Sequence, residues 1–141
     1  MEIKTAINYR ESIEALLASE HLPVADLPAT LENFVVALQN KEVIGVAGLE
    51  VHGDSGLLRS VTVKLEYRGQ GVAAQLILQI EALALSKRLS SVYLLTETAA
   101  GYFERKGYQQ IARTNVPAEL QRASQFSHVC PKSAIVMMKS L

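Results

Sequence analysis

The sequence lacks an excess of charge of either sign. Its 141 residues carry 14 Lys and Arg against 14 Asp and Glu, so the formal net charge is zero. Proteins that bind nucleic acid normally carry a marked excess of Lys and Arg, because neutralising phosphates supplies most of their affinity. The balance therefore argues against nucleic acid, and against an anionic membrane surface, as the main partner.

Cysteine is nearly absent as well. Cys130 is the only cysteine, so neither an intrachain disulfide framework nor a zinc site with several thiolate ligands can form. The three histidines, His21, His52 and His128, lie in different segments and do not show the spacing of metal ligands. The sequence thus predicts no metal site, and it favours Cys130 as a buried, unreactive thiol.

Long apolar runs are also missing. The longest, Ile44–Leu49, is interrupted by glycine and is far shorter than the roughly 20 residues that a membrane helix needs. The first residues mix polar and apolar side chains, unlike the basic and then apolar pattern of a signal peptide. We therefore expect a cytoplasmic protein that does not enter the membrane.

What the sequence does contain is enough apolar material for a folded core, 49% of the residues. The length fits one domain over residues 1–141, and no linker or internal repeat divides it. Short β-rich runs alternate with segments of helical periodicity, which predicts a mixed α/β fold.

The periodicity predicts both kinds of element along the whole chain. Strands are expected at Glu2–Thr5, Phe34–Leu38, Glu42–Val51, Leu57–Lys64, Ser91–Thr96, Gly107–Arg113 and Ala134–Lys139. Helices are expected from Asn8, as the cap, to about Ser19, after Gly71, and at Ala99–Lys106 and Pro117–Ser124. The helix after Gly71 has the strongest pattern, with one apolar stripe formed by Val72, Ala73, Leu76, Ile77, Ile80, Leu83 and Ala84.

The most informative segment is the junction between a strand and this helix, Arg68-Gly69-Gln70-Gly71-Val72-Ala73. Free amides at a helix N-terminus bind phosphate oxygens, and glycine lets the backbone approach a ligand closely. The segment lacks the third glycine of a dinucleotide-binding loop and the Gly-Lys-Ser/Thr of a P-loop. By itself, a Gly-x-Gly pair is as compatible with a plain helix start as with a ligand site.

Residues 68–73 nevertheless match the (Arg/Gln)-x-x-Gly-x-(Gly/Ala) signature, so the chain resembles the GCN5-related N-acetyltransferases, the GNAT superfamily. The likeness extends to Tyr93–Thr96 and to Ala100–Tyr108, which resemble the later strand and helix of that family. It implies a mixed sheet of six to seven strands with helices on both faces, splayed between the strands at Leu57–Lys64 and Ser91–Thr96. It also implies acetyl-CoA as cosubstrate and a small-molecule amine as acceptor.

The resemblance assigns the cofactor-binding residues. Arg68, Gly69, Gln70, Gly71, Val72 and Ala73 would hold the pyrophosphate of coenzyme A, and the main chains of Val61 and Val63 would meet its pantetheine arm. Ordinary strand core is the alternative for the two valines, whose side chains are expected in the core in either case.

Transfer of an acetyl group to an amine needs a base, since an amine with a pKa of about 10 must first lose its proton. Glu50 is the first candidate base and Glu97 the second, and a solvated or ion-paired carboxylate is the alternative for each. The tyrosine that usually serves as acid in the family is Phe103 here, with Tyr102 one position earlier. Weak candidates for another acid are Tyr108, Ser133 and Cys130.

A narrower likeness joins segments such as Leu57–Val61 and Phe126–Ala134 to the acetyltransferases of arsenic-resistance operons, but one cysteine cannot supply two or three thiolates for arsenic. The end of the chain resembles, more distantly, the acetyltransferase domain of N-acetylglutamate synthase. The carboxylate-binding arginines of that enzyme are replaced at Glu97–Thr98 and Pro131–Ser133, which argues against glutamate as substrate. Arg59 is either a ligand of a substrate carboxylate or a surface charge at a strand edge.

Two functions stay open from the sequence. The first is an acetyl-CoA-dependent N-acetyltransferase acting on an amino-acid-like amine, and the second is a non-catalytic module that binds or senses acyl-CoA. A homodimer through the sheet edge or the C-terminal segment is a further expectation.

Overall fold

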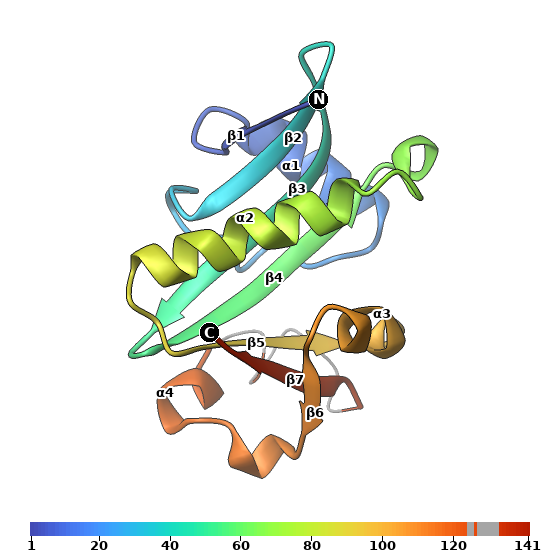
Figure 1. Cartoon of the computed structure of the whole chain (residues 1–141). Coiled ribbons are helices and arrows are strands. Elements are labelled where there is room, and N and C mark those ends of the chain that lie inside the picture. The colour runs from blue at the N-terminus through green and yellow to red at the C-terminus, as the bar shows by residue number, and fades with distance from the viewer. Residues whose placement is uncertain (124–125, 127–132) are drawn as a thin grey trace. The chain divides into compact units, whose positions relative to one another are not determined.

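The computed structural model describes residues 1–123, 126 and 133–141. In this part of the chain four helices and seven strands form a mixed α/β fold (Figure 1). The strands are β1 (Glu2–Thr5), β2 (Phe34–Gln39), β3 (Glu42–His52), β4 (Ser55–Val63), β5 (Ser91–Thr96), β6 (Gln109–Ile111) and β7 (Ile135–Ser140). The α-helices are α1 (Arg10–Ser19), α2 (Val72–Ser86), α3 (Ala100–Arg105) and α4 (Ala118–Gln121), and two 3-10 turns are η1 (Leu65–Tyr67) and η2 (Arg113–Asn115).

The sheet has the strand order β1-β2-β3-β4-β5-β7-β6. Neighbouring strands β1 and β2, β2 and β3, β5 and β7, and β6 and β7 run antiparallel. Strands β4 and β5 run parallel, with Ser55 opposite Ser91 and Leu57 opposite Tyr93. The predicted α/β class and the mixed sheet of six to seven strands are therefore confirmed.

Two compact units make up the chain. The first comprises Met1–Leu49 and Leu58–Leu83, and the second comprises Glu50–Leu57 and Ala84–Leu141. Strands β3 and β4 each contribute to both units, because the unit boundaries fall within them.

Helices α1 and α2 cover opposite faces of the sheet in the first unit. Val46 of β3 belongs to the buried cluster that contains Ile13 and Leu17 of α1. A Cβ built on the neighbouring Gly45 would lie 3.0 Å from Leu76 of α2. Successive residues of a strand point to opposite faces, so the two helices lie on different sides of β3.

The second unit is also covered on both faces. Val136 of β7 packs in a cluster with Leu120 of α4. Lys139, three residues later on the same strand and hence on the other face, donates from Nζ to the carbonyl oxygen of Lys106 just after α3, at 3.0 Å. The expected helices on both faces of the sheet are thus present in each unit.

Several predicted boundaries differ from the structure, and β4 begins at Ser55 and not at Leu57. The cap of α1 is Tyr9 and not Asn8, and no side chain caps this end; the Tyr9 amide donates to the carbonyl of Ala6, which turns the chain into the helix one residue later. Strand β6 is shorter than predicted, because Gly107 has a φ of +96° and η2 follows the strand. Helix α4 ends at Gln121, and Pro117 precedes it as its cap.

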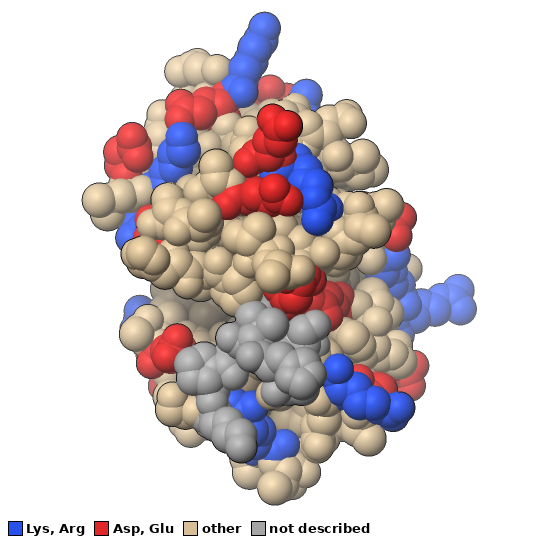
Figure 2. All heavy atoms as spheres, turned by 180° about the vertical axis from the view of Figure 1, so that it is seen from behind, with Lys and Arg blue, Asp and Glu red and all other residues tan. Residues whose placement is uncertain are grey.

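The surface agrees with the balanced composition. On the face shown in Figure 2, acidic and basic side chains of the described residues are interspersed. None of the helices in the described residues has the length and apolarity that a bilayer crossing requires.

Gly48 offers a first test of the packing. A Cβ at this position of β3 would lie 2.4 Å from the ring of Phe34, and Phe34 is 1% exposed. We expect Gly48→Ala to lower the free energy of unfolding by about 1–3 kcal/mol, as overpacking of a core does. Urea denaturation measures it.

Gly101→Ala is the matched control, because its Cβ would meet its nearest neighbour, Arg105, at an ordinary 3.7 Å within α3. This variant should be neutral or slightly stabilising. Equal stability of the two variants would show that the Phe34 ring can move aside.

Candidate active site

The junction between β4 and α2 has the geometry of an anion site. Gly69 and Gly71 have φ values of +78° and +81°, a region that other residues avoid. A Cβ on either glycine would meet no atom within 4 Å, and both lie exposed before the first turn of α2. The first amides of a helix have no partner inside the helix. The N–H donors at the start of α2 are therefore available to a ligand in the open space beside the loop.

Arg68 lies at the start of this loop and is held by two contacts. Its Nε donates to the carbonyl oxygen of Val63 at 2.9 Å, and its Nη2 donates to Oε1 of Glu20 at 2.6 Å. The side chain is 46% exposed. The guanidinium therefore stands beside the glycine loop while it is bound to a carboxylate from the end of α1.

The two valines of β4 lie in the same unit as the loop. Val63 is buried, as expected for its side chain, and Val61 is half-buried. Ser60 between Arg59 and Val61 has a φ of +60°, which interrupts the extended conformation of β4 and is uncommon for a residue other than glycine. One lone pair of the Val63 carbonyl is already used by Arg68.

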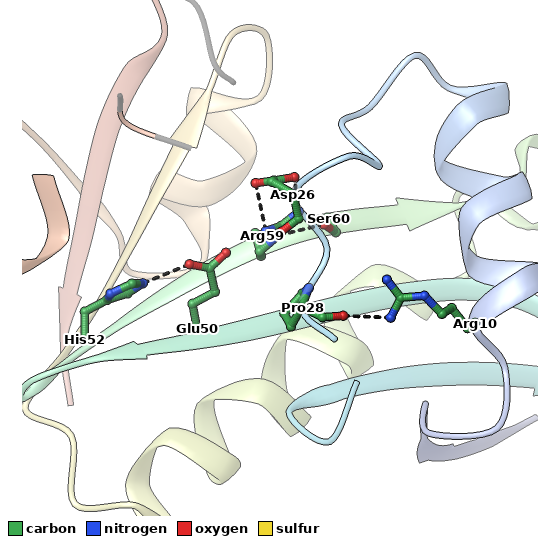
Figure 3. A network of polar contacts seen from close by, with 7 residues as sticks. All are labelled: Arg10, Asp26, Pro28, Glu50, His52, Arg59 and Ser60. Atoms are coloured by element: carbon green, nitrogen blue, oxygen red, sulfur yellow. Dashed lines mark hydrogen bonds and ion pairs between the residues drawn. The ribbon is translucent and has the colours of Figure 1, made fainter. Parts of the chain in front are cut away.

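Glu50 and His52 form a pair on β3. The Nε2 of His52 lies 2.8 Å from Oε1 of Glu50, and the two side chains are 25% and 16% exposed, respectively (Figure 3). Residues two apart on a strand share a face, so the pairing follows from the Glu-x-His spacing. The sequence alone points to no role for His52 as a metal ligand, whereas the two-residue period of a strand predicts its contact with Glu50.

Glu97, the second candidate base, lies exposed in the turn between β5 and α3. The preceding Thr96 accepts a hydrogen bond on its hydroxyl from the amide of Ala99, at 3.0 Å, which helps to start α3. Both candidate carboxylates are in the second unit, and Glu50 is the more buried of the two.

The aromatic residues around α3 explain why no tyrosine replaces the expected acid directly. Phe103 is buried, and its ring meets the rings of Tyr102 and Tyr108 edge to face, at 5.4 and 5.7 Å. Burial raises the pKa of Tyr102, although the charge of Arg105 opposes the shift. Tyr102 therefore keeps its proton at neutral pH, but it lies about 100° around the helix from Phe103.

Arg59 is a buried cation and not a surface charge. Its guanidinium forms two hydrogen bonds with the carboxylate of Asp26, at 2.8 and 3.0 Å (Figure 3). It also lies over the ring of Phe34, 5.8 Å from the ring centre. The two side chains are 1% and 7% exposed. The surface alternative for Arg59 is wrong, because the loop that contains Asp26 covers it.

A second arginine holds the same loop. Nη1 of Arg10 on α1 donates to the carbonyl oxygen of Pro28 at 2.7 Å (Figure 3). Leu27 and Leu31 are buried in the cluster beneath α1. The segment between α1 and β2 is thus bound from two elements and by its own apolar side chains.

Within the described ranges, no three His, Cys, Asp or Glu side chains are grouped so that they could hold a metal ion. Cys130, His128 and the Pro131–Lys132 pair lie outside the described residues. Ser133 is exposed.

Comparison with known protein families identifies the family of this chain. The model of the acetyltransferase (GNAT) domain matches residues 30–110, more than half of the chain, including the glycine loop. The chain belongs to the GNAT acetyltransferase family. The resemblance predicted from Arg68–Ala73 is confirmed, and so is the GNAT fold.

Relatives of this GNAT chain include two curated proteins. An uncharacterized N-acetyltransferase of Chlorobaculum tepidum is 28% identical over 116 residues, which cover 79% of this chain and 72% of the relative. An amino-acid acetyltransferase of Pseudomonas fluorescens is 28% identical over 117 residues, covering 82% of this chain but only 26% of that enzyme. The GNAT chain thus spans about a quarter of the length of the second relative.

Among solved structures, N-acetylglutamate synthase of Neisseria gonorrhoeae, complexed with coenzyme A and N-acetyl-glutamate, superposes with a TM-score of 0.81. The sequence identity is 14%, and the match covers 99% of this chain and 35% of that one. At this identity the likeness shows the GNAT fold, in keeping with the distant resemblance noted in the sequence.

Proposed function

We propose that this chain is an acetyl-CoA-dependent N-acetyltransferase that acetylates the amine of a small, amino-acid-like substrate. The proposal rests chiefly on the Arg68–Ala73 junction, an exposed glycine loop and a cation before a helix of 15 residues, in a chain of the GNAT family. Free amides and a guanidinium suit the pyrophosphate of coenzyme A. The open space at both glycines leaves room for it.

Two of the similar proteins support the substrate class that we propose. One is named an amino-acid acetyltransferase, and a structural neighbour is complexed with N-acetyl-glutamate. The arginines that the resemblance predicts for a glutamate carboxylate are absent at Glu97–Thr98 and Pro131–Ser133. We therefore propose an amino-acid-like amine other than glutamate.

The reaction we propose is direct attack in a ternary complex. The ammonium of the substrate gives its proton to Glu50, with His52 bound to the same carboxylate. The free amine then forms a bond to the thioester carbonyl carbon, and amide donors stabilise the oxyanion. The C–S bond breaks as the intermediate collapses, and the nitrogen gives its second proton to solvent so that a neutral amide forms. Coenzyme A leaves as the thiolate, which takes a proton from solvent.

A non-catalytic acyl-CoA module is the second candidate, and Phe103 favours it. This residue stands where the family usually has its acid, and it is buried among aromatic rings. Thiolate is already a fair leaving group, so the missing acid does not exclude transfer.

Thiol release from acetyl-CoA, followed across a panel of amines and amino acids, separates the two candidates. Release that depends on one class of amine supports the transferase. Tight binding of acetyl-CoA, measured by calorimetry, without release for any amine would favour the module.

Glu50→Gln should lower turnover in a way that depends on pH. We expect a loss of about a hundredfold near pH 7, because the amine then needs a base. The loss should shrink towards pH 10, where an amine with a pKa of about 10 loses its proton unaided. A pH profile of kcat/KM measures both.

Glu97→Gln is the matched control, since it removes the exposed candidate carboxylate with the same change of charge. The dependence of kcat/KM on pH for this variant should follow that of the unaltered chain. A loss for Glu50→Gln that is equal at both pH values would remove Glu50 as the base, and a pH-dependent loss in the control would assign the role to Glu97.

Further predictions stay proposals. We propose one domain over residues 1–141, in a protein of the cytoplasm. A homodimer and the closeness to arsenic-resistance acetyltransferases also stay predictions from the sequence.

A further inference from the structure

The carboxylate of Glu20 is bound to Arg68, the cation that precedes the glycine loop. Nη2 of Arg68 donates to Oε1 of Glu20 at 2.6 Å, while its Nε donates to the Val63 carbonyl. The guanidinium is thus directed to an internal anion beside the glycine loop. Because Arg68 is the cation of that loop, whatever holds it affects how anions bind there.

Glu20 is placed by the backbone and not by chance packing. It caps the C-terminus of α1, where His21 adopts a φ of +57° and the amides of His21 and Leu22 donate to the carbonyls of Ala18 and Leu17. These two bonds form a Schellman motif, which fixes the end of a helix. The end of α1 therefore fixes the backbone from which the Glu20 side chain reaches Arg68.

This position is unfavourable for a carboxylate within α1 itself. A helix carries partial negative charge at its C-terminus, which favours cations there, and the last turn of α1 contains no basic residue. The contact with Arg68 offsets this repulsion. Glu20 is repelled by the C-terminus of its own helix and attracted to Arg68, which indicates a role at the glycine loop.

The contact is also open to solvent. Glu20 lines a cavity of about 770 Å³ between α1, the turn after β2 and η1, where Lys64 is already bound to Glu42. The Glu20 side chain is 33% exposed, and ion pairs exposed to this extent contribute little to stability. A phosphate bound by several amides can therefore take Arg68 from Glu20.

We propose that Glu20 competes with the phosphates of coenzyme A for Arg68 and so lowers the affinity for the cofactor and promotes its release. The proposal rests on the proposed function of the loop. The direction of the effect on affinity follows from charge. When the phosphates bind, the Glu20 carboxylate either loses its contact with Arg68 or stays near the phosphates, which carry the same sign of charge. Both outcomes oppose binding.

Glu20→Gln keeps the shape and the acceptor oxygen of the side chain but removes its charge. Calorimetry with coenzyme A should show binding about three- to tenfold tighter than for the unaltered chain. Product inhibition by coenzyme A should strengthen by the same factor. High salt should reduce the difference, since both charges are accessible to ions.

Glu14→Gln is the control for net charge. Glu14 is on the same helix and also pairs with an arginine, Arg10, at 3.1 Å with 40% of its side chain exposed, so its loss should leave the affinity unchanged. In the background of Arg68→Gln, the Glu20 substitution should have a smaller effect, because only the repulsion between the carboxylate and the phosphates is then removed.

The outcomes separate this inference from the proposed function. If the unaltered chain binds no coenzyme A, the proposed function fails. If it binds, and Glu20→Gln matches Glu14→Gln or binds more weakly, the competition is overturned and Glu20 instead orients Arg68 for the ligand.

Discussion

Arg68→Glu should reduce the affinity for coenzyme A by about a hundredfold or more. The substitution removes charge-assisted hydrogen bonds to the phosphates and replaces attraction with repulsion, and a pair of unit charges 4 Å apart near a protein surface interacts by about 4 kcal/mol. It also places a second carboxylate beside Glu20, which binds the Arg68 guanidinium in the unaltered chain. Calorimetry with acetyl-CoA or coenzyme A measures the loss.

Lys4→Glu makes the same change of net charge on the edge strand β1, at a side chain of similar exposure, 52%. Its affinity for coenzyme A should be close to that of the unaltered chain. Because the Arg68 side chain is half-exposed, the melting temperature of Arg68→Glu should change little. Unchanged binding in a folded Arg68→Glu variant would remove this loop as the phosphate site.

Asp26→Asn should lower the free energy of unfolding by about 3–5 kcal/mol. The carboxylate forms two hydrogen bonds with a guanidinium that is 1% exposed, so its neutralisation removes one of the two charges of a buried pair. A typical domain is stable by only about 5–15 kcal/mol. Urea denaturation with two probes measures the loss.

Glu14→Gln is the contrast, because the same kind of substitution there breaks a pair that is 39% and 40% exposed. We expect it to cost less than about 1 kcal/mol. A double-mutant cycle between Asp26 and Arg59 should give a large coupling energy. Equal losses for the buried and the exposed pair would show that Asp26 contributes by packing alone.

The features that the sequence predicted correctly are local ones. The seven strands, the apolar stripe of α2 and the glycine loop each depend on residues close together in the chain, where periodicity and backbone preferences act. The strand at Ser91–Thr96 even has the predicted bounds. The prediction of Asn8 as the cap was wrong, because the turn from Ala6 to Tyr9 sets the start of α1.

The contacts that sequence reasoning missed join distant residues. Asp26 and Arg59 are 33 positions apart, and Glu20 and Arg68 are 48 apart. No pattern along the chain encodes such pairs, because they form only when α1, its following loop and β4 come together. Glu50 and His52 are the exception, since their spacing alone puts them on one face of β3.

The ion pair of Arg59 with Asp26 does in this chain what a disulfide does in many small proteins. It joins two positions that are 33 residues apart in the chain. The single cysteine of the sequence cannot form an internal disulfide in its place. Unlike a disulfide, it places no restriction on the unfolded chain, so its whole contribution belongs to the folded state. The loop after α1 is therefore held by charge, and thiol reductants and oxidants leave this closure untouched.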